Sequence, residues 1–215
     1  MMPGRTIMIV GNGEVPEGAA ATIDAADIVI RFNDCRSVGA GGMRTDIVAV
    51  CNTGRPAFAM LGGGRWKNSA PVRQAREIWS VRSARKFAGL RAALAETHPD
   101  LDDFCDDYTA GFESFAASTG RAHRVIASAS HERLDRDLSR FAPGPYVVPS
   151  SGMVVIADVL SGFAAADDDV VLAGFGHVGW ALHPFAAERQ FVDALVAEGR
   201  LRRLSPSSSD LSQGA

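Results

Sequence analysis

The sequence has little that would suit a membrane or a nucleic acid. Nowhere in its 215 residues does an apolar run approach the roughly 20 residues that a membrane-spanning helix needs. The apolar stretch near the N-terminus is also too short for the core of a signal peptide. The formal net charge is -3, so no basic excess attracts nucleic acid. We therefore expect a cytoplasmic protein with no membrane span and no nucleic-acid partner.

Cysteine is scarce, and patterns of metal-binding residues are missing. The three cysteines, Cys35, Cys51 and Cys105, are widely separated. The sequence has neither a CxxC pair nor a cluster of cysteine and histidine at the spacing of zinc ligands. A small, odd number of cysteines is typical of a reducing compartment. It argues against a disulfide scaffold, and the absence of ligand spacing argues against a zinc site.

Short apolar runs that alternate with helical patterns are what the sequence does contain. This alternation predicts the fold class α/β, with a doubly wound, mostly parallel, Rossmann-like sheet. We expect one domain over residues 1–204 and a disordered tail over 205–215. The expected strands are 7–10, 25–32, 46–51, 77–81, 146–148 and 170–173. The expected helices are 84–96, one that begins within 100–108 and continues through 115, 131–141, 153–163 and 184–198.

In such a sheet, ligands bind at the carboxyl ends of the strands, so the turns there are the candidate site. The first turn, Gly11-Asn12-Gly13, lets the backbone approach a ligand closely, and Asn12 offers both a donor and an acceptor. The next glycine, Gly18, comes at the wrong distance for a dinucleotide fingerprint. A tight turn without a ligand explains these residues as well as a nucleotide-binding turn does.

The second turn, Arg31-Phe32-Asn33, ends another expected strand. An arginine and an asparagine there suit the recognition of a base or a ribose. For Arg31 we favour a structural salt bridge instead, whereas the role of Asn33 stays open. The aspartates available for such a bridge are Asp24, Asp27 and Asp46.

The third turn, Pro149-Ser150-Ser151-Gly152, leads into an expected helix. Two hydroxyl groups and free backbone N–H groups at a helix N-terminus form a ready anion site. The alternative is that one serine only caps the helix, as serine commonly does. Two other nucleotide-like turns in the same sheet favour the anion site.

Two of the five histidines lie at the end of a strand or the start of a helix. His177 follows a glycine-rich turn after the last expected strand, and His183 directly precedes a helix that opens with Pro184. The positive end of the helix dipole disfavours the imidazolium form, so His183 is expected to be neutral, as a general base must be. Glu188 is placed to fix the geometry there, and a merely capping His183 is the alternative. The histidines expected at the surface are His98, His123 and His131.

In this order, the blocks resemble the motifs of the sialyltransferase family, glycosyltransferase family 29. Residues 9–49, which contain the first two turns, resemble the large sialyl motif. Residues 147–160, together with 170–176, resemble the small motif. His183 and Glu188, with four residues between them, fit the very short motif. Each motif alone is weak, but the ordered set is specific.

The resemblance implies a metal-independent glycosyltransferase that has no cofactor and takes a CMP-activated sugar donor as its substrate. His183 is then the base that deprotonates a hydroxyl of an unknown acceptor as it attacks the anomeric carbon. CMP leaves with its charge held by the helix N-terminus. The nucleotide-binding residues implied are Gly11, Asn12, Gly13, Asn33, Ser150, Ser151, Gly152 and His177, with Arg31 and Glu188 in support.

A non-catalytic accessory protein that keeps the nucleotide-binding fold is the alternative. The chain is shorter than a typical catalytic domain of that family, the stretch before His183 is compressed, and residues 55–146 carry no diagnostic residue. The pattern also resembles small bacterial proteins that are labelled as accessory proteins of urease operons. No histidine-rich tract, cysteine–histidine ligand pair or P-loop points to nickel chemistry. The sequence therefore gives urease subunits no support as partners.

Overall fold

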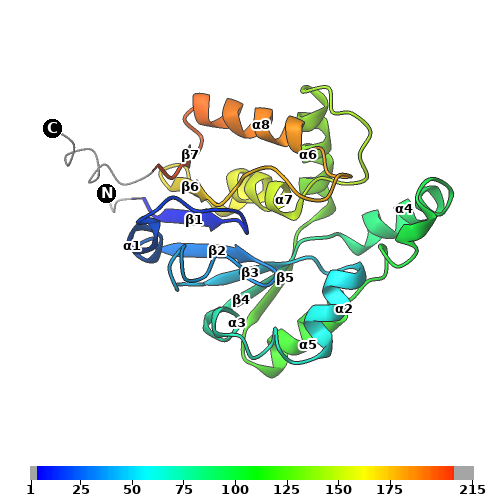
Figure 1. Cartoon of the computed structure of the whole chain (residues 1–215), viewed down its shortest axis with the longest axis horizontal. Coiled ribbons are helices and arrows are strands. Elements are labelled where there is room, and N and C mark those ends of the chain that lie inside the picture. Colours follow the sequence, from blue (N-terminus) through cyan, green and yellow to red (C-terminus); the bar gives the residue numbers. More distant parts are fainter. Residues whose placement is uncertain (1–3, 206–215) are drawn as a thin grey trace.

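A computed structural model describes residues 4–205 of the protein (Figure 1). At its centre lies one seven-stranded sheet in the order β5-β4-β3-β2-β1-β6-β7, and every described pairing is parallel. This confirms the predicted α/β class. The expected disordered tail falls, apart from its first residue, outside the described residues. The strands are β1 (Thr6–Val10), β2 (Ile28–Phe32), β3 (Ile47–Val50), β4 (Glu77–Ser80), β5 (Ala122–Val125), β6 (Asp169–Ala173) and β7 (Arg202–Arg203).

Helices cover both faces of the sheet (Figure 1). One face carries α1 (Ala19–Asp24), α2 (Gly54–Gly62), α3 (Ala70–Gln74) and α5 (Thr109–Ser118). The other face carries α6 (Ser128–Ser139), α7 (Ser151–Asp158) and α8 (Phe185–Ala197). The remaining elements are α4 (Ala84–Thr97), the 3-10 helix η1 (Pro99–Leu101) and the π-helix η2 (Val159–Phe163), which continues α7. None of the helices within residues 4–205 is both long and apolar enough to cross a membrane.

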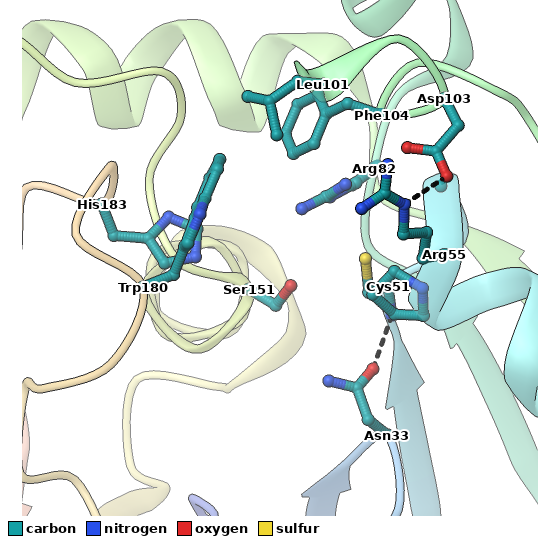
Figure 2. A pocket seen from close by; sticks show the side chains of 12 residues that line it. Asn33, Cys51, Arg55, Arg82, Leu101, Asp103, Phe104, Ser151, Trp180 and His183 are labelled. Atoms are coloured by element: carbon teal, nitrogen blue, oxygen red, sulfur yellow. Dashed lines mark hydrogen bonds and ion pairs between the residues drawn. The ribbon is translucent and has the colours of Figure 1, made fainter. Parts of the chain in front are cut away.

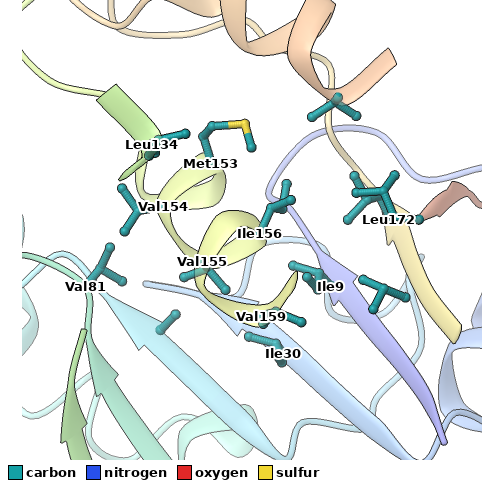
Figure 3. Close-up of a cluster of buried hydrophobic side chains, with 14 of the residues drawn as sticks. Ile9, Ile30, Val81, Leu134, Met153, Val154, Val155, Ile156, Val159 and Leu172 are labelled. Atoms are coloured by element: carbon teal, nitrogen blue, oxygen red, sulfur yellow. The ribbon is translucent and has the colours of Figure 1, made fainter. Parts of the chain in front are cut away.

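The central strands β1, β2 and β3 are mostly apolar because both faces of the sheet are buried there, as is usual for parallel sheets. Along β1, Ile9 contributes to the core beneath α7, whereas Met8 packs on the opposite side beneath α1. Figure 3 shows Ile9 beside Ile156 of α7 and Val159, the first residue of η2. Each such fully buried aliphatic side chain contributes about 1.5–3 kcal/mol to stability. The same packing fixes where the N-terminus of α7 meets the sheet.

The order of the strands reverses between β1 and β6. From β1 to β5 the chain adds strands in one direction, and then a crossover through α6 and α7 on the other face brings β6 to the free side of β1. A reversal of this kind leaves a crevice at the carboxyl ends of the two strands, which is where doubly wound folds bind ligands. The turns Gly11-Asn12-Gly13 and Gly174-Phe175-Gly176 meet there.

Glycine at these turns is required by the close contact between them. Gly11 donates a hydrogen bond to the Ala173 carbonyl (2.8 Å), and Gly13 donates one to the Gly174 carbonyl (3.0 Å). A Cβ atom at Gly11 would lie 2.3 Å from the Gly174 carbonyl oxygen, and Gly174 itself has a φ of +69°. The tight turn that we weighed against nucleotide binding therefore exists, and it forms one wall of the crevice.

Two expected elements are absent from the described structure, and two strands were not expected. Residues 146–148 form no strand, because Pro143, Pro145 and Pro149 leave this segment few backbone donors for a ladder. No helix starts within 100–108; that segment forms η1 and turns, and α5 begins at Thr109. The unexpected strands, β5 and β7, lie at the two edges of the sheet, where a strand need not be apolar. The second strand starts later than expected, because Ala25, Ala26 and Asp27 follow the end of α1.

The prediction that His131 is a surface residue is wrong. Its side chain is buried on the inner face of α6, together with Leu134 and Leu138, and Nε2 donates to the Val81 carbonyl (2.9 Å). Spacings of three and four residues put all three side chains on one helical face. His98 and His123 are partly exposed.

The glycine contact predicts a contrast between two substitutions. We expect Gly11→Ala to lower the free energy of unfolding by about 1–3 kcal/mol, because the new methyl group overpacks against a backbone carbonyl. Gly89→Ala is the matched control, since Gly89 is an exposed residue inside α4 with nothing near its Cβ position. It should raise stability by about 0.5–1 kcal/mol. Urea denaturation measures both, and equal effects would show that the two turns can separate freely.

Candidate functional site

Two adjoining cavities lie at the carboxyl edge of the sheet. The switch-point cavity, about 450 Å³, lies between the two glycine turns and the start of α7. The Arg82 cavity, about 380 Å³, lies between the start of α7 and the ends of β3 and β4 (Figure 2). The side chains that line both are Asn33, Ser151, Trp180 and His183.

The structure brings most of the predicted site residues together. All the expected nucleotide-binding residues line the switch-point cavity, as do His183 and Glu188. Arg31 does not line either cavity. Motif order in the sequence thus becomes proximity in space, because the carboxyl ends of parallel strands meet at one edge of the sheet.

The two predicted asparagines differ in how much of the side chain is available to a ligand. Asn12 connects the first two turns, since Nδ2 donates to the Phe32 carbonyl (3.2 Å) and Oδ1 accepts from the Arg36 N–H (2.9 Å). Asn33 has a φ of +50°, and its Oδ1 accepts from the Cys51 N–H (2.8 Å). Within residues 4–205, nothing accepts a hydrogen bond from Asn33 Nδ2, which faces the cavity in Figure 2. Asn33 therefore offers a free donor, whereas Asn12 chiefly holds the turns together.

The two serines at the start of α7 have separate roles. Ser150 caps the helix by accepting from the Met153 N–H (3.2 Å), and its own hydroxyl and N–H donate to Glu188 (2.7 and 2.6 Å). The Ser151 hydroxyl and the N–H groups of Ser151 and Gly152 have no partner among the described residues. Free donors at a helix N-terminus attract anions. The candidate anion site therefore begins at Ser151, and Ser150 holds the helix start next to it through its hydrogen bonds to Glu188.

Glu188 holds this helix start in place. It lies on α8, is only 1% exposed, and binds Ser150 through both carboxylate oxygens. Burial raises the pKa of Glu188, while the hydrogen bonds from Ser150 oppose that rise. A carboxylate at the positive end of α7 is also favoured by the helix dipole. The pairing locks α8 against the start of α7.

His183 is held as a neutral base by the neighbouring segment. Its Nδ1 lies 2.8 Å from the Val148 carbonyl, which can only accept, so Nδ1 carries the proton and the neutral ring leaves Nε2 unprotonated. Burial lowers the pKa of His183, and the charge of Arg82 lowers it further, while the bond to Val148 opposes both. The sequence suggested the helix dipole as the cause, whereas burial is the main cause in the structure. His183 and Glu188 thus hold residues 148–150 through hydrogen bonds at two points, Val148 and Ser150, an arrangement called the clasp below.

Arg31 has the structural role that we favoured, but its partners are not aspartates. The side chain is fully buried and makes four hydrogen bonds, three to backbone carbonyls and one to Ser37. These bonds fasten the loop between β2 and β3, and burial lowers the pKa of the guanidinium. The carbonyls that accept are those of Arg44, Gly41 and Gly42.

His177 lies at the mouth of the switch-point cavity with a φ of +50°. Burial lowers its pKa to about 4, and the positive charges of Arg203 and Arg189 contribute. The ring is therefore neutral at pH 7, so it can approach a phosphate only as a hydrogen-bonding group.

Sequence reasoning missed Arg82, which lines the second cavity. It comes two residues after β4, from a stretch that carries no family motif. A polar side chain nevertheless follows each of the first four strands, namely Asn12, Asn33, Asn52 and Arg82. Extending the strand-end rule from β1 and β2 to β3 and β4 would have found it.

Solved structures with the same architecture define the class of fold. No family model matches the sequence. A mammalian sialyltransferase in complex with Gal-beta-1-3GalNAc-ortho-nitrophenol aligns with a TM-score of 0.53 and 15% identity, covering 94% of this chain and 70% of that one. The sialyltransferase CstII from Campylobacter jejuni, in complex with the substrate analogue cytidine-5'-monophosphate, aligns with 0.51 and 11%, covering 95% and 81%. This chain therefore has the sialyltransferase-like Rossmann fold, and at such identities the likeness extends to the fold alone.

A relative among curated proteins gives the family. The chain is 78% identical, over 216 residues and 100% of both chains, to the urease operon 23 kDa accessory protein of Rhizobium meliloti (strain 1021). The protein belongs to the family of that urease operon accessory protein.

The lowered pKa of His177 predicts how stability depends on pH. Between about 4 and 6.5, the unfolded chain binds a proton at this residue that the folded protein does not, so stability falls as the pH falls. His177→Asn should reduce this fall, and asparagine tolerates the positive φ. Thermal melting of both proteins from pH 7 to pH 4 measures the effect. Parallel curves would mean that His177 titrates normally.

Proposed function

We propose that the switch-point cavity binds a cytidine nucleotide and that the protein transfers a sugar from a CMP-activated donor. The observation that carries this proposal is the set of unpartnered donors at the start of α7, the Ser151 hydroxyl with the N–H groups of Ser151 and Gly152. They adjoin the glycine turns, which leave room for a phosphate to approach the backbone. Cytidine, rather than another base, is supported by the motif resemblance, and the fold neighbour from C. jejuni carries CMP. We assign this activity to the cytoplasm, in keeping with three buried free thiols.

His183 supplies the base for the transfer. Its unprotonated Nε2 accepts the proton of the acceptor hydroxyl while that oxygen forms a bond to the anomeric carbon of the donor. The bond between this carbon and the phosphate oxygen breaks, and its electron pair leaves with CMP. The N-terminus of α7 stabilises the charge that develops on the leaving phosphate. The hydrogen bonds from His183 to Val148 and from Ser150 to Glu188 keep the base and the anion site in a fixed position relative to each other.

Separate variants test binding and chemistry. Calorimetric titration should detect CMP in preference to UMP, AMP and GTP. Ser151→Ala should weaken CMP binding about tenfold, the value of a hydrogen bond to a charged group. His183→Ala should leave CMP binding nearly unchanged but lower transfer about 100-fold or more. His98→Ala, outside both cavities, is the control for both measurements.

The contrary outcomes are distinct for the two claims. Equal affinity for the four nucleotides would contradict the proposed cytidine site. Unchanged transfer by His183→Ala, with a CMP-sugar as donor, would contradict the proposed mechanism but not the site.

A non-catalytic role in a urease operon is the second candidate. It is supported by the name of the relative that is 78% identical, and by the internal use of Ser150 and Asn12, whose side chains serve the fold. In this role, a nucleotide bound in the pocket would be sensed or would stabilise the protein, and no sugar transfer would be catalysed.

Complementation in a strain that lacks the gene separates the two roles. The transferase role predicts that wild-type protein, but not His183→Ala, restores the deletion phenotype, whatever its effect on urease activity. The accessory role predicts lowered urease activity in the deletion strain and equal restoration by both proteins. Normal urease activity in the deletion strain would count against a part in urease maturation.

A further inference from the structure

Arg82 is a buried cation without a counter-ion. Arg82 is only 8% exposed, and its guanidinium forms no ion pair with any residue within 4–205. Of the five N–H donors that a guanidinium carries, a single one has a partner there, the Thr53 hydroxyl at 2.6 Å. Burial of a charge that is left unpaired is costly. An external anion would offset that cost.

Arg31 shows how this protein satisfies an arginine whose role is structural. It is at least as deeply buried, yet three of its nitrogens donate to protein oxygens through four hydrogen bonds. At Arg82, Nε and Nη2 have no acceptor among the described residues. The difference lies in the surroundings, since Arg82 lines a cavity and Arg31 does not.

One wall of the Arg82 cavity is formed by the aromatic rings of Phe104 and Trp180, and Phe87 packs against the guanidinium from outside the lining. The guanidinium carbon lies 4.8 Å from the ring centroid of Phe87 and 4.5 Å from that of Phe104. Phe104 in turn stacks on Trp180, with centroids 5.4 Å apart. These rings hold the guanidinium in one orientation and give the cavity a flat apolar face, which suits the C–H face of a sugar ring.

Asp103, the carboxylate that lines this cavity, is already paired. It accepts a hydrogen bond from Arg55 Nε at 2.8 Å, so it does not neutralise Arg82. Burial raises the pKa of the nearby Cys105 thiol, which therefore carries no charge that would balance Arg82. The charge of Arg82 remains open to a ligand.

His183 connects this cavity to the proposed chemistry. It lines the cavity together with Ser151, and Figure 2 shows both across the hollow from Arg82. A molecule whose anionic group lies at Arg82 can therefore present a hydroxyl to the histidine. The nucleotide side of the site lies beyond Ser151, in the other cavity.

We propose that the Arg82 cavity binds an acidic sugar acceptor through a carboxylate that pairs with the Arg82 guanidinium. The fork of N–H groups matches a carboxylate bidentately. One unpaired charge beside an aromatic wall favours this singly charged group over a phosphate dianion, since the other cation of the lining, Arg55, is already paired with Asp103. The acceptor assignment rests on the proposed function, whereas the carboxylate subsite itself does not.

Binding of simple sugars tests the subsite directly. D-glucuronate and D-galacturonate are titrated against D-glucose and D-galactose, with and without CMP, and inorganic phosphate is a further arm. In the wild type, each uronate should bind at least about tenfold more tightly than its neutral partner, as expected for one charge-assisted pair. Arg82→Met should abolish this preference, and Arg85→Gln, which removes an exposed charge outside the cavity, should keep it.

Thermal melting shows whether Arg82 is merely structural. Arg82→Met replaces an unpaired buried charge by an apolar side chain, so its Tm should stay within about 2 °C of the wild type or rise. Arg31→Met is the contrasting variant, because it removes a satisfied buried arginine and should lower the Tm by roughly 6 °C or more. A fall of that size for Arg82→Met would overturn the proposal.

The outcomes separate this proposal from the proposed function. A uronate preference that depends on Arg82 without any CMP binding would support the subsite and overturn the transferase. CMP binding without a uronate preference would do the reverse. Phosphate binding more tightly than both uronates would overturn the carboxylate assignment.

Discussion

The candidate site depends on the clasp by which the start of α8 holds residues 148–150. Glu188 binds the N–H and hydroxyl of Ser150, and His183 binds the Val148 carbonyl. The segment itself forms no strand, so the sheet does not fix its position. His183 is the proposed base, and Glu188 holds the N-terminus of α7. Because both bind the same short segment, a substitution of either residue is expected to displace both the base and the helix N-terminus. The spacing of four residues between them lets one end of a helix reach two successive points of an extended segment.

The candidate site depends secondly on the switch point, where the order of the strands reverses between β1 and β6. Gly11 and Gly174 can approach each other only because neither has a side chain, and this approach brings the turn after β1 against the turn after β6. Gly152 is likewise required by close packing, since a Cβ there would lie 2.6 Å from the Phe175 ring. The glycines thus serve the fold first. The open backbone surface that nucleotide binding would use is a consequence of this packing.

The sequence was sufficient to predict the central strands of the sheet and most of the residues that meet at their carboxyl ends. Buried strands are apolar runs, and the turns after them converge whatever the details of packing. What it could not predict is which polar atoms remain free. Ser150 and Ser151 are adjacent and chemically identical, yet one is used by Glu188 and the other is not. Arg31 was expected to meet an aspartate and meets carbonyls, because the loop from 33 to 46 folds back over it. His131 was predicted to lie at the surface but is buried. The inner face of a short amphipathic helix can hold a histidine whose ring N–H donates to a backbone carbonyl.

The electrostatics of the site follow from the positive groups around the two cavities that His183 lines. These are the unpartnered N–H groups of α7 and the unpaired guanidinium of Arg82. Burial lowers the pKa of His183 and the charge of Arg82 acts in the same sense, against the opposing hydrogen bond to Val148, so Nε2 stays available at neutral pH. The proposed base must nevertheless accept a proton during the reaction, and burial and the charge of Arg82 both oppose that step. An anion bound in either cavity would favour it, because a bound negative charge stabilises the imidazolium that forms. The proposed nucleotide site and the proposed carboxylate subsite would therefore both assist the same base.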